Sequence, residues 1–570
     1  MRSDWHGSDG DCTRDVDKRR PRSSFSGASS IAADSTAQSS PLASPRRRRV
    51  QHLHHARSFL YHRGIPTLRG APLSDPACVD LLIIGGGING VGIARDAIGR
   101  GLSVMLVEQA DLASGTSSAS TKLIHGGLRY LELYEFRLVR ESLQERERLL
   151  ALAPHIISPM TFVLPHTPGL RPYWQIRLGL FLYDHIGGRK QLPASRSIDL
   201  THSPYASVLR EDLARGFVYS DCVVDDSRLV IVNAVDAAQR GATILTRTKF
   251  LQAHAQDGLW HASCQDQRSH HRFEVRARAL VNGAGPWVEQ VLDHVPDVAI
   301  ASNIRLVKGS HVVVPRIYDG DAAFLLQHPD NRVIFAIPFE RAYTLIGTTD
   351  VAFDGDPSKV EITPAEISYL CESASRYFRT RITPADVRWT YAGVRPLLDD
   401  AHMDMSKITR DYRIELTRTM SGAPLLSIFG GKITTYRRLA EAATDSILNE
   451  LQGRHPAWTS SAALPGGDIP EGDIARFARD IAGRWPFLPE ATCSRLARAY
   501  GTCVEQVLGQ SRSMGDLGEH FGAGLTEAEV EYLRSREWAQ SAEDVLWRRT
   551  KLGLHLADDE QQRLREYMSG

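Results

Sequence analysis

A glycine-rich turn between a short apolar run and a helix constrains the fold more than any other feature of this sequence. Residues 79–84 form an apolar run that predicts a fully buried strand of a parallel sheet. Gly85, Gly87 and Gly90 follow it with the spacing GxGxxG, and a second apolar run at 103–107 comes after a helical stretch. This β–α–β pattern predicts a Rossmann-like dinucleotide-binding domain.

Each glycine of the turn has its own physical reason. Gly85 permits the tight turn, Gly87 lets backbone amides approach a pyrophosphate, and Gly90 allows the helix to pack closely. The helix N-terminus presents free N–H groups and a partial positive charge to the anion. Glu108 closes the second strand, where we expect it to accept hydrogen bonds from ribose hydroxyls. The alternative for this pattern is a structural glycine turn without a ligand.

A loop of small residues at 114–127 favours FAD over a nicotinamide cofactor. It contains many hydroxyl groups, including those of Ser117 and Ser118, and the glycine pair Gly126 and Gly127. Two later turns are expected to return to the cofactor, although each in isolation is equally consistent with an ordinary turn. Their candidate cofactor-binding residues are Gly285 in the first turn and Gly430, Gly431, Lys432 and Thr434 in the second.

The first 75 of the 570 residues differ from the rest of the chain in charge and composition. Residues 1–75 hold 13 Lys and Arg against 7 Asp, whereas the whole chain has a formal charge of only +1. This balance disfavours a nucleic-acid-binding protein, and no apolar run is long enough for a conventional transmembrane helix. The seven cysteines show no CxxC spacing, so neither a metal site nor a disulfide framework is indicated, and a reducing compartment fits best.

The domain organisation follows from the same composition changes. We expect 1–76 to be a disordered, basic, Ser-rich tail. Residues 77–456 are expected to hold a discontinuous FAD-binding domain (77–160, 215–300 and 395–456) interleaved with a β-rich substrate domain (161–214 and 301–394). Short β-rich runs at 310–314, 333–337 and 344–346 support the second domain, and helical spacing at 527–536 and 542–554 predicts a C-terminal helical domain over 457–570.

Long strings of residues resemble those of the FAD-dependent, quinone-reducing glycerol-3-phosphate dehydrogenase family. They are 83–90, 116–132, 219–226, 306–311, 346–350, 391–397, 429–437 and 547–551. The resemblance implies an α/β fold in which a Rossmann-like FAD-binding domain is combined with an antiparallel, amino-acid-oxidase-like substrate domain and a C-terminal helical domain. It also implies oxidation of sn-glycerol 3-phosphate to dihydroxyacetone phosphate by hydride transfer from C2 to FAD N5, and a role for Asp350 at the cofactor.

The substrate needs a clamp for a phosphate dianion and a base for its C2 hydroxyl. Arg can bind phosphate bidentately and Tyr can donate a further hydrogen bond. With the resemblance, four groups are expected to converge on one phosphate in one cavity: Arg129, Tyr130, Arg395 and Lys432. Alternation with valines along the strand-like segment 306–314 makes Lys308 a further candidate for the substrate site. His311 is a candidate base because its ordinary pKa suits a neutral pH. Arg395 is the rival, either as the group that stabilises the alkoxide or as the base.

Electrons are expected to pass to a membrane quinone, as the resemblance implies. The stretch 173–183 carries aromatic and aliphatic residues between arginines and suits the surface of a bilayer, although a core helix explains it equally well. We therefore expect a peripheral protein on the inner face of the cytoplasmic membrane, with a homodimer as the family's expectation. The alternatives are an oxygen-reducing glycerol-phosphate or amine oxidase of the same fold, and a flavin-containing scaffold without catalysis.

Overall fold

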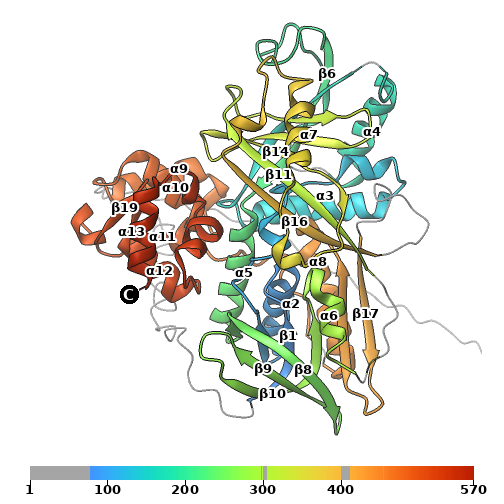
Figure 1. Ribbon diagram of the computed structural model, residues 1–570, viewed down its shortest axis with the longest axis vertical. Helices are drawn as coiled ribbons and strands as arrows, with labels where there is room; N and C mark the ends of the chain where they lie inside the picture. The colour runs from blue at the N-terminus through green and yellow to red at the C-terminus, as the bar shows by residue number, and fades with distance from the viewer. Residues whose placement is uncertain are drawn as a thin grey trace, which may run out of the picture. The chain divides into compact units, whose positions relative to one another are not determined.

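The computed structural model describes residues 77–569, apart from 168, 189–190, 297, 299–303, 399–410 and 454. Within this part of the chain two large sheets stand against each other and a set of helices follows at the C-terminal end (Figure 1). The predicted tail at 1–76 lies outside the described residues.

The first sheet has eight strands and carries the predicted β–α–β unit. Its strand order is β17-β18-β10-β1-β2-β7, in which β18, β10, β1, β2 and β7 run parallel, while β8 and β9 extend it beside β10. Their bounds are β1 (Ala77–Ile84), β2 (Val104–Val107), β7 (Thr243–Leu245), β8 (Thr248–Gln256), β9 (Leu259–Asp266), β10 (Arg272–Asn282), β17 (Tyr412–Arg418) and β18 (Pro424–Gly430). Parallel strands share their carboxyl edge, so the glycine turns that follow β1, β10 and β18 meet there.

Helices pack on this sheet, and a hydrophobic core lies between them and the strands. The bounds are α2 (Ile88–Gly99), α5 (Asp226–Gln239), α6 (Val288–Leu292) and α8 (Tyr436–Glu450), and α2 packs on both α5 and α8. The apolar run that predicted β1 is buried almost completely, with Leu81, Leu82 and Ile83 fully inaccessible. Such burial on both faces is typical of a central parallel strand.

The second sheet has ten strands and is mostly antiparallel. Its order is β15-β11-β14-β13-β12-β4-β6-β3, with β16 beside β11 and β5 beside β6. Its strands are β3 (Leu123–Ile124), β4 (Ile157–Pro165), β5 (Arg196–Asp199), β6 (Arg215–Val224), β11 (Ile304–Pro315), β12 (Ala323–Gln327), β13 (Val333–Phe339), β14 (Tyr343–Gly347), β15 (Val351–Ala352) and β16 (Trp389–Leu398). Helices α3 (Phe136–Leu152), α4 (Tyr173–Ile186) and α7 (Pro364–Ser375) pack against it.

Several segments that the sequence analysis assigned to the FAD-binding domain lie in the second sheet. β3 (Leu123–Ile124) and the start of β4 (Ile157–Pro165), both within 77–160, pair with β6 there. β6 (Arg215–Val224) pairs with β4 and β16 (Trp389–Leu398) pairs with β11, so both lie in the second sheet. The proposed boundaries at 215 and 395 had placed β6 and part of β16 in the FAD-binding domain. The three short runs at 310–314, 333–337 and 344–346 are strands of the second sheet, as predicted.

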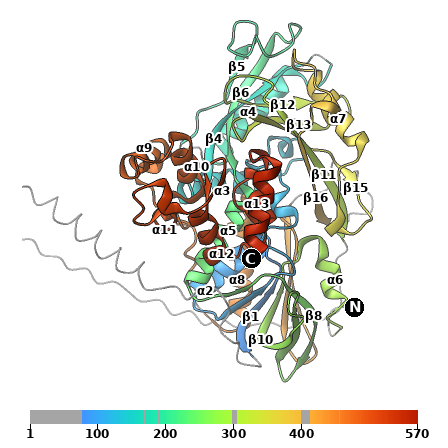
Figure 2. The same cartoon turned by 60° about the vertical axis from the view of Figure 1, so that its left-hand side comes forward.

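The C-terminal residues form a helical domain with its own hydrophobic core. Its helices are α9 (Ile474–Arg484), α10 (Glu490–Tyr500), α11 (Val504–Leu508), α12 (Glu527–Arg536) and α13 (Asp558–Ser569), with a small hairpin of β19 (His520–Gly522) and β20 (Leu525–Thr526). Both ribbon views place these helices beside α5 (Figure 1, Figure 2). Arg228 of α5 binds Glu537 through both guanidinium nitrogens, and both side chains are buried.

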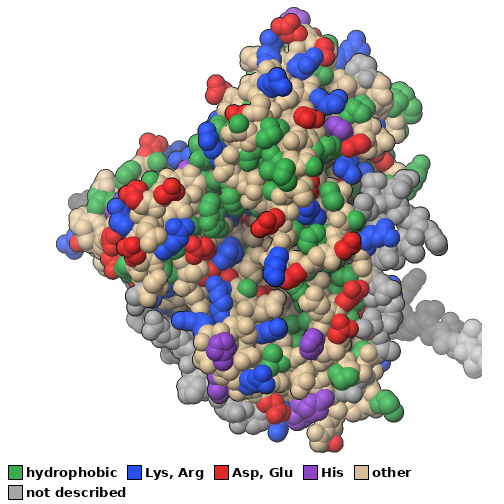
Figure 3. All heavy atoms as spheres, viewed as in Figure 1, with side chains coloured by type: hydrophobic (Ala, Val, Ile, Leu, Met, Phe, Trp, Pro, Cys, Tyr) green, Lys and Arg blue, Asp and Glu red, His purple; other side chains and the backbone are tan. Residues whose placement is uncertain are grey.

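Surface charge is mixed on the face that Figure 3 shows. Basic and acidic side chains of the described residues are interspersed there, and the C-terminal helices carry both signs (Figure 3). Among the described helices, none is both long and apolar enough to cross a bilayer.

Candidate active site

The glycine turn after β1 is held by contacts that leave no room for side chains. A Cβ on Gly90 would lie 1.9 Å from the carbonyl oxygen of Gly85, and one on Gly85 would lie 2.6 Å from that of Gly283. Gly85 also has a φ of +109°, which favours glycine. The amide of Ile88 donates to Ser117 Oγ at 3.0 Å, so the flavin loop of residues 114–127 is fixed to the start of α2.

Glu108 lies where the second parallel strand ends, beside the same turn. Its carboxylate accepts hydrogen bonds from the amide of Gly86 at 2.7 Å and from that of Ala110 at 2.8 Å. Burial raises the pKa of this carboxyl, and the two backbone hydrogen bonds oppose that effect. The acid therefore has a fixed position at the strand end, which is where the ribose of a bound dinucleotide lies in such folds.

One cavity of about 1900 Å³ runs from this turn to the second sheet. Most of the predicted cofactor residues line it, namely Gly85, Gly87, Glu108, Ser117, Ser118, Gly127, Gly285, Asp350, Gly430, Gly431, Lys432 and Thr434. The predicted substrate and catalytic residues that line it are Arg129, Tyr130, His311, Arg395 and Lys432. Gly90 and Gly126 lie behind the wall, where their lack of a side chain allows close packing against Gly85 and Leu143.

His311 is a buried, neutral imidazole at the wall of this cavity. It is 1% exposed, and its Nε2 lies 3.0 Å from Thr121 Oγ1, while Nδ1 has no hydrogen-bond partner among the described residues. Its ring stacks on Tyr391 with centroids 4.7 Å apart. Burial holds the pKa of His311 well below its usual range, and the charges of Arg395 and Lys122 act in the same direction. A neutral imidazole is the form that can accept a proton.

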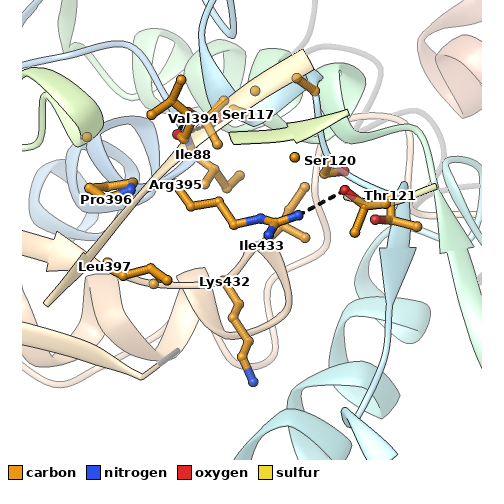
Figure 4. A pocket seen from close by; sticks show the side chains of 18 of the residues that line it. Ile88, Ser117, Ser120, Thr121, Val394, Arg395, Pro396, Leu397, Lys432 and Ile433 are labelled. Carbon is orange, nitrogen blue, oxygen red and sulfur yellow. Dashed lines mark hydrogen bonds between the residues drawn. The ribbon is translucent and has the colours of Figure 1, made fainter. Parts of the chain in front are cut away.

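Arg395 and Lys432 lie in different parts of the cavity. The guanidinium of Arg395 binds the carboxylate of Asp350 and donates to Thr348 Oγ1 at 3.0 Å. The ammonium of Lys432 lies over the ring of Tyr130, 3.7 Å from its centroid. Figure 4 shows the two side chains pointing in different directions from their strand and turn. The predicted convergence of these side chains on one phosphate stays a prediction, since they line one cavity but point in different directions in it.

Lys308 is not among the residues that line the cavity. Its Nζ binds Glu366 Oε2 at 2.8 Å and the carbonyl oxygen of Glu361 at 3.0 Å. Lys308 and His311 are three residues apart on β11, and an odd separation puts two side chains on opposite faces of a strand. Since His311 faces the cavity, Lys308 faces α7, and we leave it out of the substrate site.

Several residues that the sequence analysis did not single out contribute to this site. Thr348 contacts Arg395, and Thr121 contacts His311. Tyr391 stacks on the imidazole of His311. A polar residue next to a strand end was the available signal for Thr348, because it follows β14 directly. Lys122 gave no such signal, because its partner Asp226 is 104 residues away.

The fold and the cavity define a flavoprotein oxidoreductase of the two-sheet type. Residues 80–437 match the family described as FAD dependent oxidoreductase, and 457–569 match the C-terminal domain of alpha-glycerophosphate oxidase. The chain belongs to the family of FAD-dependent glycerol-3-phosphate dehydrogenases, and its cofactor is FAD.

Curated relatives and a solved structure agree with this assignment. A glycerol-3-phosphate dehydrogenase of Pseudomonas aeruginosa is 51% identical over 498 residues, covering 87% of this chain and 96% of that protein. A D-erythritol 1-phosphate dehydrogenase of Brucella abortus is 50% identical, covering 86% and 97%. The structure of a glycerol-3-phosphate dehydrogenase from Bacillus halodurans complexed with FAD superimposes with a TM-score of 0.66 at 28% identity, covering 86% of this chain and 94% of that one.

Proposed function

We propose that this protein oxidises sn-glycerol 3-phosphate at C2 to dihydroxyacetone phosphate. The observation that carries the proposal is the presence, in one cavity, of the buried imidazole of His311 and the cationic side chains of Arg129, Arg395 and Lys432. The residues of the glycine turn, Glu108 and the flavin loop fit FAD and would hold it. FAD, when bound, supplies the acceptor for the hydride that leaves C2.

The different directions of the Arg395 and Lys432 side chains suggest how the substrate is oriented. Lys432, with Tyr130 and the nearby Arg129, is assigned to the phosphate, because all three line the cavity and an ammonium, a phenol and a guanidinium can each donate hydrogen bonds to a dianion. Arg395 is already countercharged by Asp350, so we assign it to the C2 oxygen, where negative charge develops during oxidation. His311 accepts the proton of the C2 hydroxyl.

The absorption spectrum of the purified holoenzyme tests this proposal. Bleaching of the flavin band by sn-glycerol 3-phosphate, without bleaching by glycerol, is the expected result. D-erythritol 1-phosphate is the essential second ligand, because a relative with that name is as similar as the glycerol-3-phosphate dehydrogenases. Faster bleaching by the erythritol phosphate would move the substrate assignment to the longer polyol, and no bleaching by either would refute the proposed function.

A membrane quinone is the proposed electron acceptor, and α4 is the proposed membrane contact. One face of α4 buries Ile176, Leu180 and Tyr183, whereas Trp174 and Phe181 on the other face are 68% and 49% exposed. Leu178, also exposed, lies between them and lines the cavity mouth. Exposed aromatic and aliphatic residues in such a stripe suit a bilayer surface. We propose the inner face of the cytoplasmic membrane as the place of this contact.

Cosedimentation with phospholipid vesicles tests the membrane contact. Replacing Trp174, Leu178 and Phe181 with Glu is expected to abolish cosedimentation while dye-linked activity survives. The matched control is Met420→Glu, which changes a fully exposed apolar residue outside α4. Unchanged cosedimentation of the triple variant would remove α4 as the contact. Peroxide formed in proportion to substrate would show that oxygen, and not a quinone, is the acceptor.

A further inference from the structure

A buried ion pair lies behind the wall of the active site. Lys122 Nζ is 2.8 Å from Asp226 Oδ1, and the two residues are 3% and 0% exposed. Lys122 also has a φ of +59°, a conformation that a non-glycine residue keeps only where its surroundings enforce it. Ion pairs buried so deeply lose much of their attraction to desolvation, so this pair needs a reason beyond stability.

Both members of the pair hold the same turn of the flavin loop. Lys122 Nζ donates to the carbonyl oxygen of Ser118 at 3.0 Å. Asp226 Oδ2 accepts from the hydroxyl of Ser120 at 2.7 Å and from its amide at 3.2 Å. An apolar pair of the same size would fill the space, but it would leave these loop groups without their partners.

The same turn carries the hydroxyl that contacts the proposed base. Thr121, between Ser120 and Lys122, places Oγ1 3.0 Å from His311 Nε2. Tyr391, on which the imidazole stacks, donates its hydroxyl to the carbonyl oxygen of Ser120 at 2.9 Å. His311 is therefore positioned twice by one turn, once through Thr121 and once through Tyr391.

Charge reaches His311 from two sides. The charged groups that face it are Lys122 from the flavin loop and Arg395 from β16, and each is countered by its own carboxylate, Asp226 or Asp350. Lys122 Nζ lies 5.0 Å from the centroid of the Tyr391 ring, on which the imidazole also stacks. Burial contributes most to the lowered pKa of His311, and the charges of Arg395 and Lys122 lower it further.

The C-terminal domain supports the same helix start. Lys551 Nζ lies 3.3 Å from Asp225 Oδ1 and donates to Ser227 Oγ, and Lys551 is 2% exposed. Asp225 caps α5 by accepting from the amide of Arg228. Asp226 is therefore held at the first turn of a helix that the C-terminal domain fixes from outside.

We propose that Lys122 and Asp226 are positioning residues for the oxidation, which orient His311 through Thr121 and Tyr391 and act on its imidazole with opposite charges. This inference rests on the proposed function, because it takes His311 as the base. It assigns to the ion pair a role in the proton transfer that the pair performs without touching substrate or FAD.

The test follows flavin reduction by single-turnover mixing of holoenzyme with sn-glycerol 3-phosphate across a range of pH. Lys122→Met removes the cation and is expected to move the acidic limb of the rate profile to higher pH by about one unit. Asp226→Asn removes the anion and is expected to move that limb to lower pH. Both variants are expected to reduce the flavin about 10- to 100-fold more slowly, with a small effect on KM. Lys122→Arg is expected to restore the position of the limb.

The control is Arg495→Met, which breaks a partly buried pair with Glu529 inside the C-terminal domain, away from the cavity. A purely structural pair predicts that Lys122→Met and Asp226→Asn behave like this control, with no displaced limb or with displacements of the same sign, and either result overturns the proposal. If Lys122→Met does not yield folded holoenzyme, the other two variants decide. The proposal then requires that the limb moves to lower pH in Asp226→Asn and keeps its wild-type position in Lys122→Arg. Failure of the proposed function is seen separately, as wild-type flavin that neither polyol phosphate bleaches.

Discussion

Gly90→Ala tests whether the glycine turn forms the cofactor site as the structure implies. Alanine normally favours a helix over glycine by about 1 kcal/mol, so at an ordinary position of α2 the change would stabilise the protein. At this position the new Cβ lies 1.9 Å from the carbonyl oxygen of Gly85 and 3.1 Å from its carbon. Those are backbone atoms, which cannot rotate away as a side chain would.

The size of the effect follows from that contact. A Cβ needs at least about 3 Å from an oxygen, so the start of α2 must move about 1 Å away from the turn. Overpacking of this kind costs about 1–3 kcal/mol, and the displaced helix carries the amides that would bind the pyrophosphate. Since 1.4 kcal/mol is a tenfold change in a dissociation constant, FAD affinity is expected to fall about tenfold to a hundredfold.

The assay is FAD content after gel filtration, followed by a fluorescence titration of the apoprotein with FAD. Gly483→Ala is the matched control, because Gly483 lies in α9 and its Cβ would meet no atom within 4 Å. The control is expected to keep wild-type affinity and to gain slightly in stability. If Gly90→Ala retains stoichiometric FAD with unchanged affinity, the close approach of α2 to this turn does not shape the cofactor site.

Three further variants test the site and its support. Lys432→Met is expected to lower kcat/KM about 10- to 100-fold, mainly through KM, with FAD content preserved; loss of FAD instead would assign Lys432 to the cofactor. Burial lowers the pKa of His155 to about 3. Below pH 6.5 the unfolded chain therefore binds a proton that the folded chain does not, so the free energy of unfolding decreases as the pH is lowered. His155→Leu is expected to remove about 2 kcal/mol of the difference between unfolding free energies at pH 7 and pH 5, and an unchanged difference would contradict this. Glu537→Gln breaks the buried pair with Arg228 and is expected to cost about 3–5 kcal/mol, measured by thermal unfolding and by faster proteolysis of the C-terminal domain.

Local patterns were sufficient for the parts of the fold that depend on neighbouring residues. The β–α–β unit lies within about thirty residues, so its buried strands, helix and closing acid could be recognised from spacing alone. Helix α12 (Glu527–Arg536) has the bounds that its charge and apolar spacing predicted. In both cases the apolar residues that create the periodicity of the sequence are the residues that pack into the core.

Strand partners could not be obtained in this way. β6 (Arg215–Val224) and β16 (Trp389–Leu398) are as apolar and as short as strands of the first sheet, and nothing in their own residues names a partner. β16 joins β11, about eighty residues earlier, with Arg395 opposite Val307. That pairing, and not the residues around Arg395, decides that its guanidinium reaches Thr348 and Asp350.

The parity of β11 shows that some information in the sequence was present but unused. Lys308 and His311 both alternate with valines, which makes each a plausible inward residue when taken singly. Taken together they cannot share a face, because side chains of a strand alternate. The structure puts Ser310 with Lys308 against Glu366 and leaves His311 for the cavity.

Carboxylates beside the cations change what a count of positive charges implies for the substrate site. From the sequence, each Arg or Lys near the flavin loop adds one positive charge for a phosphate. In the structure Arg395 shares its charge with Asp350, and Lys122 shares its charge with Asp226. A paired cation attracts a free dianion less, but it still stabilises charge that develops within hydrogen-bonding distance during a reaction. This is the physical basis on which we propose Arg395 for the C2 oxygen and Lys432, whose side chain points in a different direction, for the phosphate.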